Sequence, residues 1–396
     1  TVSLVASPEL CRRRNRGHRS AHGWLRLGHR RGLYSVEYAI TCSATSGRKR
    51  GTGDTAQMID LIVVGGGPAG LMTAIHARLR GLEVTVIEKR SGSIDKACGE
   101  GLMPDALSRL QAVGVNPAGH DFHGIRYISK GRVAQAKFRS GPGRGVRRLT
   151  LHSDLQARAQ ELGVETVTSR VTEIHHSDGW IGAGGLRARY LVGADGLHSQ
   201  VRRILGLGEN SSDARRFGVR QHFGIAPWSD CVEVYWLKDA EVYVTPVSTD
   251  TVGVAVLGRA ILDLDAAVAR IPDLAAKLAS VPSVSEVRGA GPLFQRVSKR
   301  SADRALLVGD ASGYIDALTG EGLRLGFAEA EAAVDAIVAD EPERYEHAWQ
   351  KATRSYRLMT GALLWASSRR AVRPLIVPAA QAMPGVFTRI VGSLAA

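Results

Sequence analysis

One segment near the start of the chain constrains the fold more than any other. Residues 59–90 read IDLIVVGGGPAGLMTAIHARLRGLEVTVIEKR, which is an apolar run, a glycine-rich turn, an amphipathic stretch and a second apolar run. The β-branched residues of the apolar runs predict strands, and the spacing of Leu71, Ile75 and Leu79 predicts a helix between them. We therefore expect a βαβ unit in a parallel sheet, with a dinucleotide at the carboxyl ends of the strands.

The glycine turn of this segment fits the pattern G-x-G-x-x-G. Gly65 permits a tight turn, Gly67 allows the backbone to approach a pyrophosphate, and Gly70 allows helix and strand to pack closely. The helix N-terminus presents unpaired N–H groups to phosphates. Glu88, about 20 residues further on, is placed to bind a ribose, and its charge disfavours the 2′-phosphate of NADP. From this unit we expect cofactor contacts by Gly65, Gly67, Pro68, Ala69, Gly70, Glu88 and Lys89.

Two later segments distinguish FAD from NAD as the dinucleotide. In residues 187–206 an apolar run leads into Asp195, and in residues 304–338 another leads into Asp310. Both patterns place an Asp at the carboxyl end of a strand, where open α/β sheets bind their ligands. A glycine turn at 320–322 precedes a long helical pattern, and a helix N-terminus there would stabilise the negative charge of a reduced flavin.

In this order, the three segments resemble the flavoprotein hydroxylase superfamily, the FAD-dependent monooxygenases related to p-hydroxybenzoate hydroxylase. The resemblance implies FAD as the cofactor and NADH or NADPH as a transient co-substrate, because no second dinucleotide fold is present. It implies that Asp310 binds the ribityl chain and that Asp195 lies near the pyrophosphate and is linked to NADPH use. Arg148 is either a flavin contact or a solvated Arg at a helix start. The resemblance also places Gly99, Gly196, Gly309, Gly320, Gly322 and Leu323 at the cofactor.

The chain departs from the usual superfamily pattern beside the flavin. The hydroxylases usually have GDAAH and a GGQG-type turn, whereas residues 309–322 read GDASGYIDALTGEG. With KACGEGLMP at 96–104, this variation is similar to the geranylgeranyl reductase branch and to related halogenases. The candidate catalytic residues are Cys98, Glu100 and Glu321. The alternative interpretation of Cys98 is an inert buried thiol, and that of Glu100 is an ordinary acidic residue in a loop. No metal site is expected, because the four cysteines are scattered and form no CxxC.

The fold class that we expect is α/β. It combines a Rossmann-type FAD-binding domain in a three-layer ββα arrangement, an inserted antiparallel β-sheet domain for substrate, and C-terminal helices. Period-2 patterns between 217 and 258 predict the inserted sheet, and GIRYIS and VAQAKFR add strands to it. The expected boundaries are 58–130, 146–216 and 290–340 for the FAD-binding domain, 217–289 with about 120–145 for the substrate-binding domain, and 341–396 for the helical region. On the inserted sheet, His222, Tyr235, Trp236 and Tyr243 either face substrate or form cross-strand pairs.

The two ends of the chain leave alternatives open. Residues 1–57 carry eleven Lys/Arg against three acids, so +8 of the net +14 lies there. Three interpretations of this leader stay open. It is upstream sequence translated because the start was placed too early, before Met58, or it is a disordered basic arm, or it is a targeting peptide. The rest is only mildly basic, and no nucleic-acid partner is expected. Residues 374–396 contain three prolines and a single charged residue, Arg389. This segment either contacts a membrane surface or covers the active site. We expect a cytoplasmic protein, with membrane association as the alternative.

The function that the resemblance implies is an NAD(P)H-dependent FAD monooxygenase. It would hydroxylate an aromatic or polyketide-like secondary metabolite with O2 through a flavin C4a-hydroperoxide. The first alternative is a geranylgeranyl reductase-like enzyme that reduces isoprenoid double bonds without O2. The second is a non-catalytic flavin-binding protein, which measurable NAD(P)H oxidation would exclude.

Overall fold

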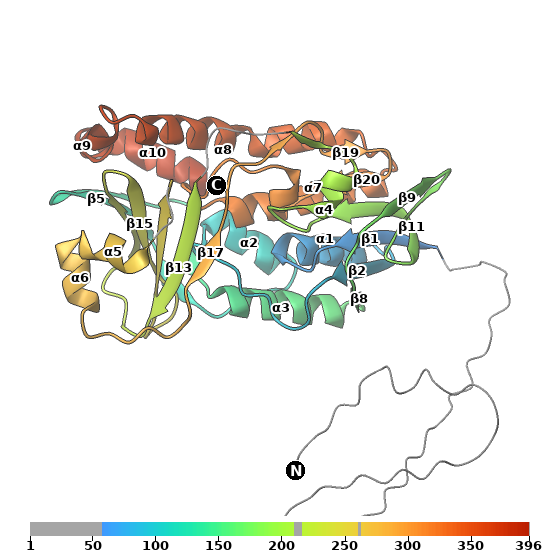
Figure 1. Ribbon diagram of the computed structural model, residues 1–396, viewed down its shortest axis with the longest axis horizontal. Helices are drawn as coiled ribbons and strands as arrows, with labels where there is room; N and C mark the ends of the chain where they lie inside the picture. Colours follow the sequence, from blue (N-terminus) through green and yellow to red (C-terminus); the bar gives the residue numbers. More distant parts are fainter. Residues whose placement is uncertain (1–57, 210–215, 260–262, 396) are drawn as a thin grey trace, which may run out of the picture. The chain divides into compact units, whose positions relative to one another are not determined.

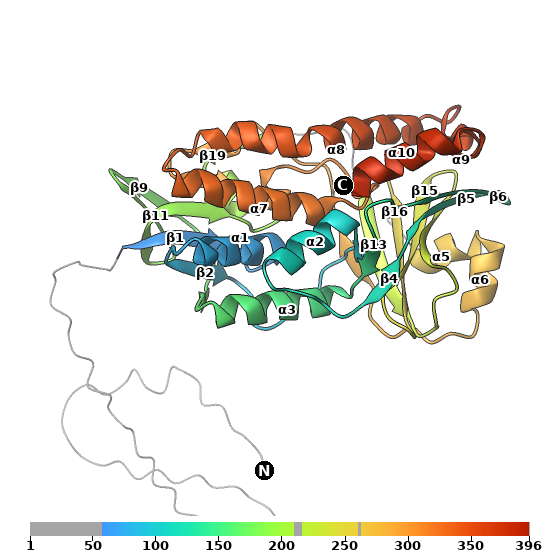
Figure 2. The same ribbon diagram turned by 180° about the vertical axis from the view of Figure 1, so that it is seen from behind.

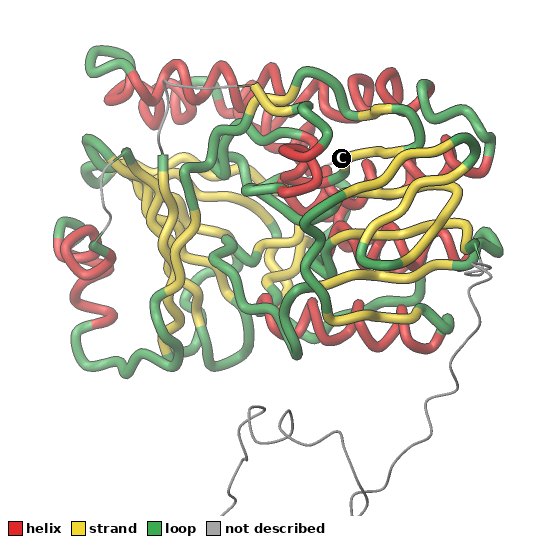
Figure 3. The backbone as a smooth tube through the Cα atoms, turned by 45° about the vertical axis from the view of Figure 1, so that its right-hand side comes forward, coloured by secondary structure: helices red, strands yellow, loops and turns green. Residues whose placement is uncertain are grey.

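The computed structural model describes residues 58–209, 216–259 and 263–395, which all belong to one compact unit. The leader 1–57, with its three alternative interpretations, lies outside the described residues. Two large sheets organise this unit, and Figure 3 shows them as separate groups of yellow strands with helices around them. The α/β fold class is therefore confirmed.

The first sheet contains the predicted βαβ unit. Its parallel strands have the order β20-β11-β1-β2-β8, and β19 pairs antiparallel with β20 at one edge. Numbered along the chain, the five parallel strands lie in the order 5-4-1-2-3, so the direction of connection reverses between β1 and β11. Ligands bind outside the carboxyl ends at such a point. The bounds are β1 (Ile59–Val64), β2 (Val84–Glu88), β8 (Glu165–Thr168), β11 (Leu186–Gly193), β19 (Ser301–Ala302) and β20 (Ala305–Leu307). In addition, β10 (Trp180–Ala183) pairs with β11, and β9 (Ile174–Ser177) pairs with β10.

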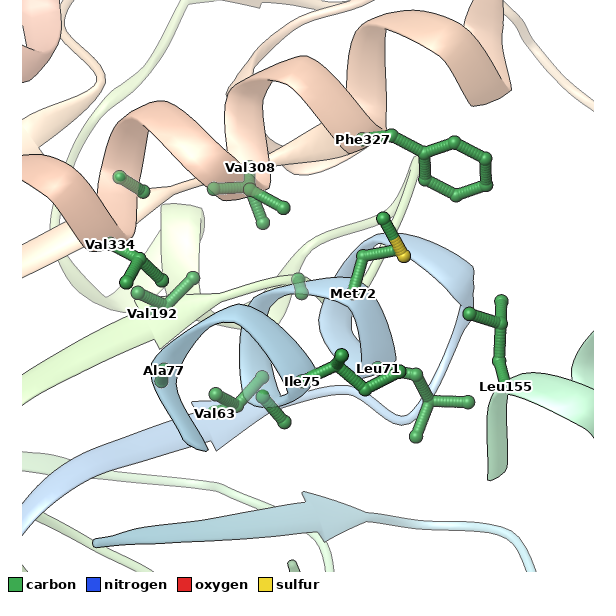
Figure 4. Packing of buried hydrophobic residues seen from close by; sticks show 14 of the residues in the cluster. Val63, Leu71, Met72, Ile75, Ala77, Leu155, Val192, Val308, Phe327 and Val334 are labelled. Carbon is green, nitrogen blue, oxygen red and sulfur yellow. The ribbon is translucent and has the colours of Figure 1, made fainter. Parts of the chain in front are cut away.

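Helices cover one face of this sheet and form its main core with it. Figure 4 shows Met72 and Ile75 of α1 between the strands and α7, which contributes Phe327. Burial of each large apolar side chain contributes roughly 1.5–3 kcal/mol. The helices of this region are α1 (Pro68–Leu79), α2 (Pro104–Ala112), α3 (Arg148–Glu161) and α7 (Gly322–Val338). A second apolar cluster on the other strand faces involves β10 and the short helix α4 (Gln200–Ile204).

The second sheet has the order β17-β13-β16-β15-β14-β5-β6. The segments GIRYIS and VAQAKFR do add strands to it, as expected. The sheet is antiparallel except in one pair, because the added strand β5 runs parallel to β14. A parallel pair needs a long connection, and here about a hundred residues, among them several strands of the first sheet, separate the two strands. The bounds are β5 (Gly124–Ser129), β6 (Arg132–Lys137), β13 (Phe217–Phe223), β14 (Cys231–Trp236), β15 (Ala240–Pro246), β16 (Val252–Gly258) and β17 (Arg288–Ala290).

Smaller elements surround the second sheet. α5 (Leu264–Ala269) and α6 (Pro272–Leu278) pack against one of its faces, as Figure 1 shows. Part of the segment 120–145 belongs to a separate small sheet, in which β7 (Gly143–Gly145) lies between β3 (Gly101–Leu102) and β4 (His120–Phe122). A two-stranded ladder joins β12 (Gly208–Glu209) and β18 (Arg296–Val297). The proposed domain boundaries stay a prediction.

The C-terminal region is helical, as predicted. The helix expected for 343–370 is α8 (Arg344–Ser368), followed by η3 (Arg373–Leu375), α9 (Ile376–Ala382) and α10 (Pro384–Ala395). α9 and α10 pack against β6 of the second sheet. In the described chain, no single helix has the length and apolar character needed to cross a membrane. The pair 373–382 and 384–395 passes that test only jointly, on length and composition, and is bent by 105°.

Candidate functional site

One cavity of about 520 Å³ joins the two sheets. It begins at the carboxyl ends of β1 and β11, where Gly65 and Asp195 line it. It continues to the second sheet, where Val232 and Tyr243 line it. The cavity therefore lies at the reversal of strand order and reaches the predicted substrate sheet.

Most of the residues predicted for the site line this cavity. The lining includes Gly65, Gly67, Pro68, Ala69, Glu88, Lys89, Cys98, Gly99, Glu100, Arg148, Asp195, Gly196, Asp310, Gly320, Gly322 and Leu323. Three predicted residues, Gly70, Gly309 and Glu321, are not part of the lining.

The glycine turn has the geometry that its three glycines suggest. Gly65 has a φ of +111°, and a Cβ there would lie 2.5 Å from the Ala194 carbonyl oxygen. A Cβ on Gly70 would lie 1.9 Å from the Gly65 carbonyl oxygen, so Gly70 serves close packing rather than ligand contact. At Gly67 the nearest neighbour of a Cβ is an Arg148 nitrogen at 4.0 Å, so this backbone is open to the cavity.

The turn is held from both sides through Gly66. Its N–H donates to Glu88 Oε2 at 2.8 Å, and its carbonyl oxygen lies 2.9 Å from His152 Nε2. Arg90 donates to Glu88 Oε1 from its backbone and its side chain, both at 3.0 Å. Burial acts to raise the pKa of Glu88, but these hydrogen bonds and the charge of Arg90 outweigh it, and the pKa lies below its usual value. Glu88 is therefore an ionised acceptor at the edge of the cavity.

Arg148 is a buried cation without a carboxylate partner in the described chain. It begins α3, lines the cavity, and its Nε atom has no hydrogen-bond acceptor. Burial lowers the pKa of this guanidinium, partly offset by Cys98 and acidic neighbours. A buried charge needs a counterion, and α1 also presents an N-terminus with no capping side chain and no acid in its first turn. This end of the cavity fits the diphosphate of a dinucleotide.

The two predicted aspartates differ in how many hydrogen bonds and ion pairs their carboxylates form within the protein. Asp195 accepts from Ser199 Oγ at 2.5 Å and from the Gln200 N–H at 2.6 Å, so it caps α4. Within the described residues, Asp310 forms one ion pair, with Lys96 Nζ at 3.5 Å, and its carboxylate stays partly exposed. Asp310 is therefore free to bind a ligand hydroxyl, whereas Asp195 shapes its loop.

Arg202 joins the two aspartate loops, and it was absent from the predicted site. Its guanidinium donates to the carbonyl oxygens of Ala311 at 3.0 Å and Leu197 at 2.8 Å. Its place seven residues after Asp195 was visible in the sequence. Only the fold shows that it reaches the loop at 309–312.

Glu321 is turned away from the cavity. It is buried and accepts from Arg324 Nε at 3.1 Å and Nη2 at 2.5 Å. Burial raises the pKa of Glu321, opposed by the charge of Arg324. Its suggested catalytic role therefore has no geometric support, because the carboxylate is engaged within the first turn of α7. The N-terminus of α7 does face the cavity through Gly322.

Cys98 and Glu100 lie together in the loop before β3. Burial is the main influence on the Cys98 thiol and raises its pKa, so the thiol stays protonated and is a poor nucleophile. Glu100 has a φ of +58°, and its side chain is buried. Its Oε1 accepts from the Arg148 N–H at 2.8 Å, and its Oε2 lies 2.5 Å from His222 Nε2. Glu100 is thus fixed at the cavity wall.

A chain of hydrogen bonds leads from Glu100 away from the cavity. His222 Nδ1 lies 3.1 Å from Arg220 Nη1 and 2.9 Å from Ser285 Oγ. Because a guanidinium can only donate, Nδ1 is an acceptor, and Nε2 therefore carries the hydrogen that is donated to Glu100. Arg220 is neutralised by Asp95 at 2.6 Å, and Ser285 is half-buried. The chain Glu100–His222–Ser285 thus runs from the cavity towards solvent.

The other polar aromatic side chains of the second sheet divide into two groups. Tyr243 lines the cavity, and its hydroxyl donates to the Leu318 carbonyl oxygen at 2.9 Å. Tyr235 donates to Glu233 at 2.7 Å, and Trp236 packs against Tyr127; neither lines the cavity. The substrate-facing interpretation therefore applies to Tyr243 only, and indirectly to His222.

The far end of the cavity is apolar and partly aromatic. Its side chains come from the second sheet, the small sheet, the loop before α7 and α10, and they are Phe122, Ile125, Tyr127, Val232, Val234, Leu318 and Leu394. Leu394 belongs to α10 and is buried. The C-terminal segment therefore forms part of the cavity wall, which agrees with the covering role considered for it.

Comparisons with known proteins extend this picture. The family described as FAD binding domain matches residues 58–344. Digeranylgeranylglycerophospholipid reductase 1 of Methanopyrus kandleri is 28% identical over 335 residues, which cover 74% of this chain and 87% of that protein. The rifampicin monooxygenase of Streptomyces venezuelae is 28% identical over 317 residues, 69% of this chain and 62% of that protein. A structure of the flavin-dependent brominase Bmp2 matches with a TM-score of 0.74 at 18% identity, covering 85% of this chain and 93% of that one.

Proposed function

The chain belongs to the FAD binding domain family, and we propose that it is an NAD(P)H-dependent FAD monooxygenase that hydroxylates a largely apolar aromatic or polyketide-like compound. Membership of this family makes the protein an FAD-dependent oxidoreductase. When bound, the flavin supplies the redox chemistry, and the protein supplies binding, orientation and electrostatics. Gly67, the N-terminus of α1 and Arg148 would hold the diphosphate, Glu88 a ribose, and Asp310 the ribityl chain.

The observation that carries this proposal is the continuity of the cavity. The dinucleotide end opens directly into a pocket walled by Phe122, Tyr127 and Tyr243. Aromatic side chains favour offset or edge-on packing with an aromatic substrate. An apolar wall also excludes water, and this protects reactive intermediates from hydrolysis.

Glu100 has the position of a proton acceptor in this reaction. Hydroxylation of a phenol is favoured when the phenol loses its proton, since the ring then becomes richer in electrons. Glu100 takes that proton on its carboxylate, which the hydrogen bond from His222 Nε2 holds in place at the cavity wall. General bases of this kind contribute typically 10²–10⁴-fold to rate.

The second candidate is reduction of an isoprenoid double bond. It is favoured by the CGEG and TGEG sequences and by the likeness to a digeranylgeranylglycerophospholipid reductase. In that reaction Glu100 would donate a proton to the substrate. A flavin-binding protein without turnover is a third alternative, against which the open Asp310 carboxylate argues.

One experiment separates these candidates. Purified protein loaded with FAD is incubated with NADPH or NADH and with phenolic or prenylated lipids, under ¹⁸O2 and under argon. Hydroxylation adds one ¹⁸O atom to the product and stops without oxygen. Double-bond reduction adds two hydrogens and continues under argon. If NAD(P)H is not oxidised with any substrate of either class, both enzymatic candidates fail.

A further inference from the structure

The last fifty residues of the chain have an unusual charge. No Asp or Glu follows Glu346, and seven Lys/Arg lie within 347–396. They are Lys351, Arg354, Arg357, Arg369, Arg370, Arg373 and Arg389. In the described chain only Arg373 among them forms an ion pair, with Glu241, and the other six are exposed. This region therefore presents positive charge without local compensation.

The same region exposes large apolar side chains. Six of the fourteen such side chains in the described chain lie between residues 358 and 390, so they are concentrated in one segment. They are Leu358, Trp365, Leu375, Met383, Val386 and Ile390, and we call them, with Arg369, Arg370 and Arg389, the C-terminal surface. Patches of exposed apolar residues rimmed by polar ones mark interaction sites.

α10 carries apolar side chains on its outer face as well as on its inner face. Its inner face buries Phe387, Val391 and Leu394 against the protein. Its outer face carries Val386 and Ile390, which are four residues apart and 47% and 44% exposed. A surface helix normally has one polar face, and a helix that is apolar all round is buried in something. The outer face of α10 therefore lacks a partner within the described chain.

α8, which lies beside α10, also exposes large apolar side chains. Leu358 and Trp365 are seven residues apart and so share one face of α8. The Arg369 guanidinium lies 4.1 Å from the Trp365 ring. Ser393 of α10 is hydrogen-bonded to Met359 of α8, and Figure 2 shows the two helices side by side at the same end. The exposed rows thus belong to neighbouring helices.

We propose that the C-terminal surface docks on a membrane whose lipids carry negative charge. Arginines attract anionic headgroups, Trp favours the interface, and the apolar side chains enter the acyl boundary. A second copy of this chain is a poorer occupant, because a two-fold interface would bring the same positive surfaces together. The helices lie on the membrane in this proposal and do not cross it.

Docking would also bring the apolar end of the cavity to the lipid phase. α10 separates the two, since Leu394 lines the cavity while Val386 and Ile390 face outward. This part rests on the proposed function, and it assigns the substrate to compounds that dissolve in membranes. The docking itself does not depend on that assignment.

The test is co-sedimentation of the full-length, FAD-loaded protein with vesicles, without substrate. We expect binding to phosphatidylcholine vesicles that contain 30% phosphatidylglycerol, weaker binding to phosphatidylcholine alone, and loss of binding as salt is raised. The variant R369Q/R370Q removes two charges and should bind roughly 30-fold more weakly. V386S/I390S should bind about tenfold more weakly or worse.

Two control variants make the test specific. V284S/V287S removes side chains of matched exposure, 46% and 50%, from another part of the surface, and R259Q/K299Q removes two other exposed charges. Both should bind vesicles as the wild type does. The proposal would be overturned if the protein sedimented equally with and without anionic vesicles, or if the control variants lost as much vesicle binding as the test variants. It would also be overturned if the wild type were a dimer that V386S/I390S dissociates. Vesicle binding that persists in a protein without hydroxylase activity would instead refute only the proposed function.

Discussion

Glu100 combines a backbone conformation that favours glycine with a buried, ionisable side chain. Its φ of +58° points the carboxylate at the Arg148 N–H and at His222, 122 residues away in the chain. Strained residues persist where the surrounding structure holds them, and they concentrate at functional sites. Gly253 leaves room for this arrangement, since a Cβ there would lie 3.3 Å from Glu100 Oε2. At the residue scale, this contact is the most specific feature of the cavity.

Replacement of Glu100 tests its role as proton acceptor. We expect Glu100→Gln to lower kcat for hydroxylation by 10²–10⁴-fold, because the amide cannot take up the substrate proton. His222→Gln and Ser285→Ala should change the solvent isotope effect, because they alter the hydrogen bonds behind Glu100.

Tyr235→Phe serves as the control for this series. Tyr235 lies on the neighbouring part of the same sheet, is buried, and does not line the cavity. Its kcat should match that of the wild type. NMR of ¹⁵N-labelled histidine in the protein without FAD should show His222 with hydrogen on Nε2. A His222 ring with hydrogen on Nδ1 would contradict the proposed hydrogen bond from His222 to Glu100.

At the scale of elements, α7 holds the loop that carries Asp310. Glu329 Oε2 accepts from the Gly309 N–H at 2.6 Å and from Ser312 Oγ at 2.9 Å. Trp349 of α8 donates to the same Ser312 hydroxyl at 2.9 Å. Burial raises the pKa of Glu329 to about 8, despite the hydrogen bonds, from an ordinary value of 4.5. α7 thus positions the loop through a carboxyl group that is neutral at neutral pH.

This carboxyl group makes the stability of the fold depend on pH. Between the ordinary pKa of 4.5 and about 8, the folded protein binds a proton that the unfolded chain has released. The free energy of unfolding should therefore decrease as pH rises through this range, by on the order of 5 kcal/mol, and level off above it. Glu329→Gln keeps an acceptor oxygen and should flatten this dependence. Urea unfolding from pH 5 to pH 9 measures it, and identical slopes in both proteins would contradict the assignment.

At the scale of the whole compact unit, a buried charge cluster joins distant parts of the chain. Glu241 of β15 is fully buried and forms ion pairs with Arg216, which precedes β13, and with Arg373 of η3, both at 2.6 Å. Arg216 also pairs with Asp316 at 2.8 Å. The cluster therefore links the second sheet, the loop before α7 and the C-terminal helices.

Removal of the central carboxylate should loosen these parts together. Glu241→Ala leaves two buried arginines short of a partner, and we expect the free energy of unfolding to fall by roughly 3–5 kcal/mol. The C-terminal helices should also become sensitive to limited proteolysis. Asp239→Ala, which removes an exposed ion pair with Arg270, should cost less than about 1 kcal/mol. Equal effects of the two substitutions would show that the cluster does not join these parts.

The sequence by itself determined the local part of the site. The strand, turn and helix at 59–90, the Asp at the end of each later strand and the helix after 322 follow from short-range patterns. Gly65 and Gly70 were recognisable because close backbone approach excludes any side chain there, whatever the rest of the chain does. The family and its cofactor followed from these segments because nearby residues set them.

Only the tertiary structure decided which distant residues meet. The pairing of Glu100 with His222 and the reach of Arg202 to the Ala311 carbonyl oxygen were not predicted. The parallel pairing of β5 with β14 was also missed. Such contacts depend on how two sheets pack and on the closure of loops of a hundred residues or more. Neither is encoded in the periodicity of a short segment, and so the chemistry of the cavity emerged only from the fold.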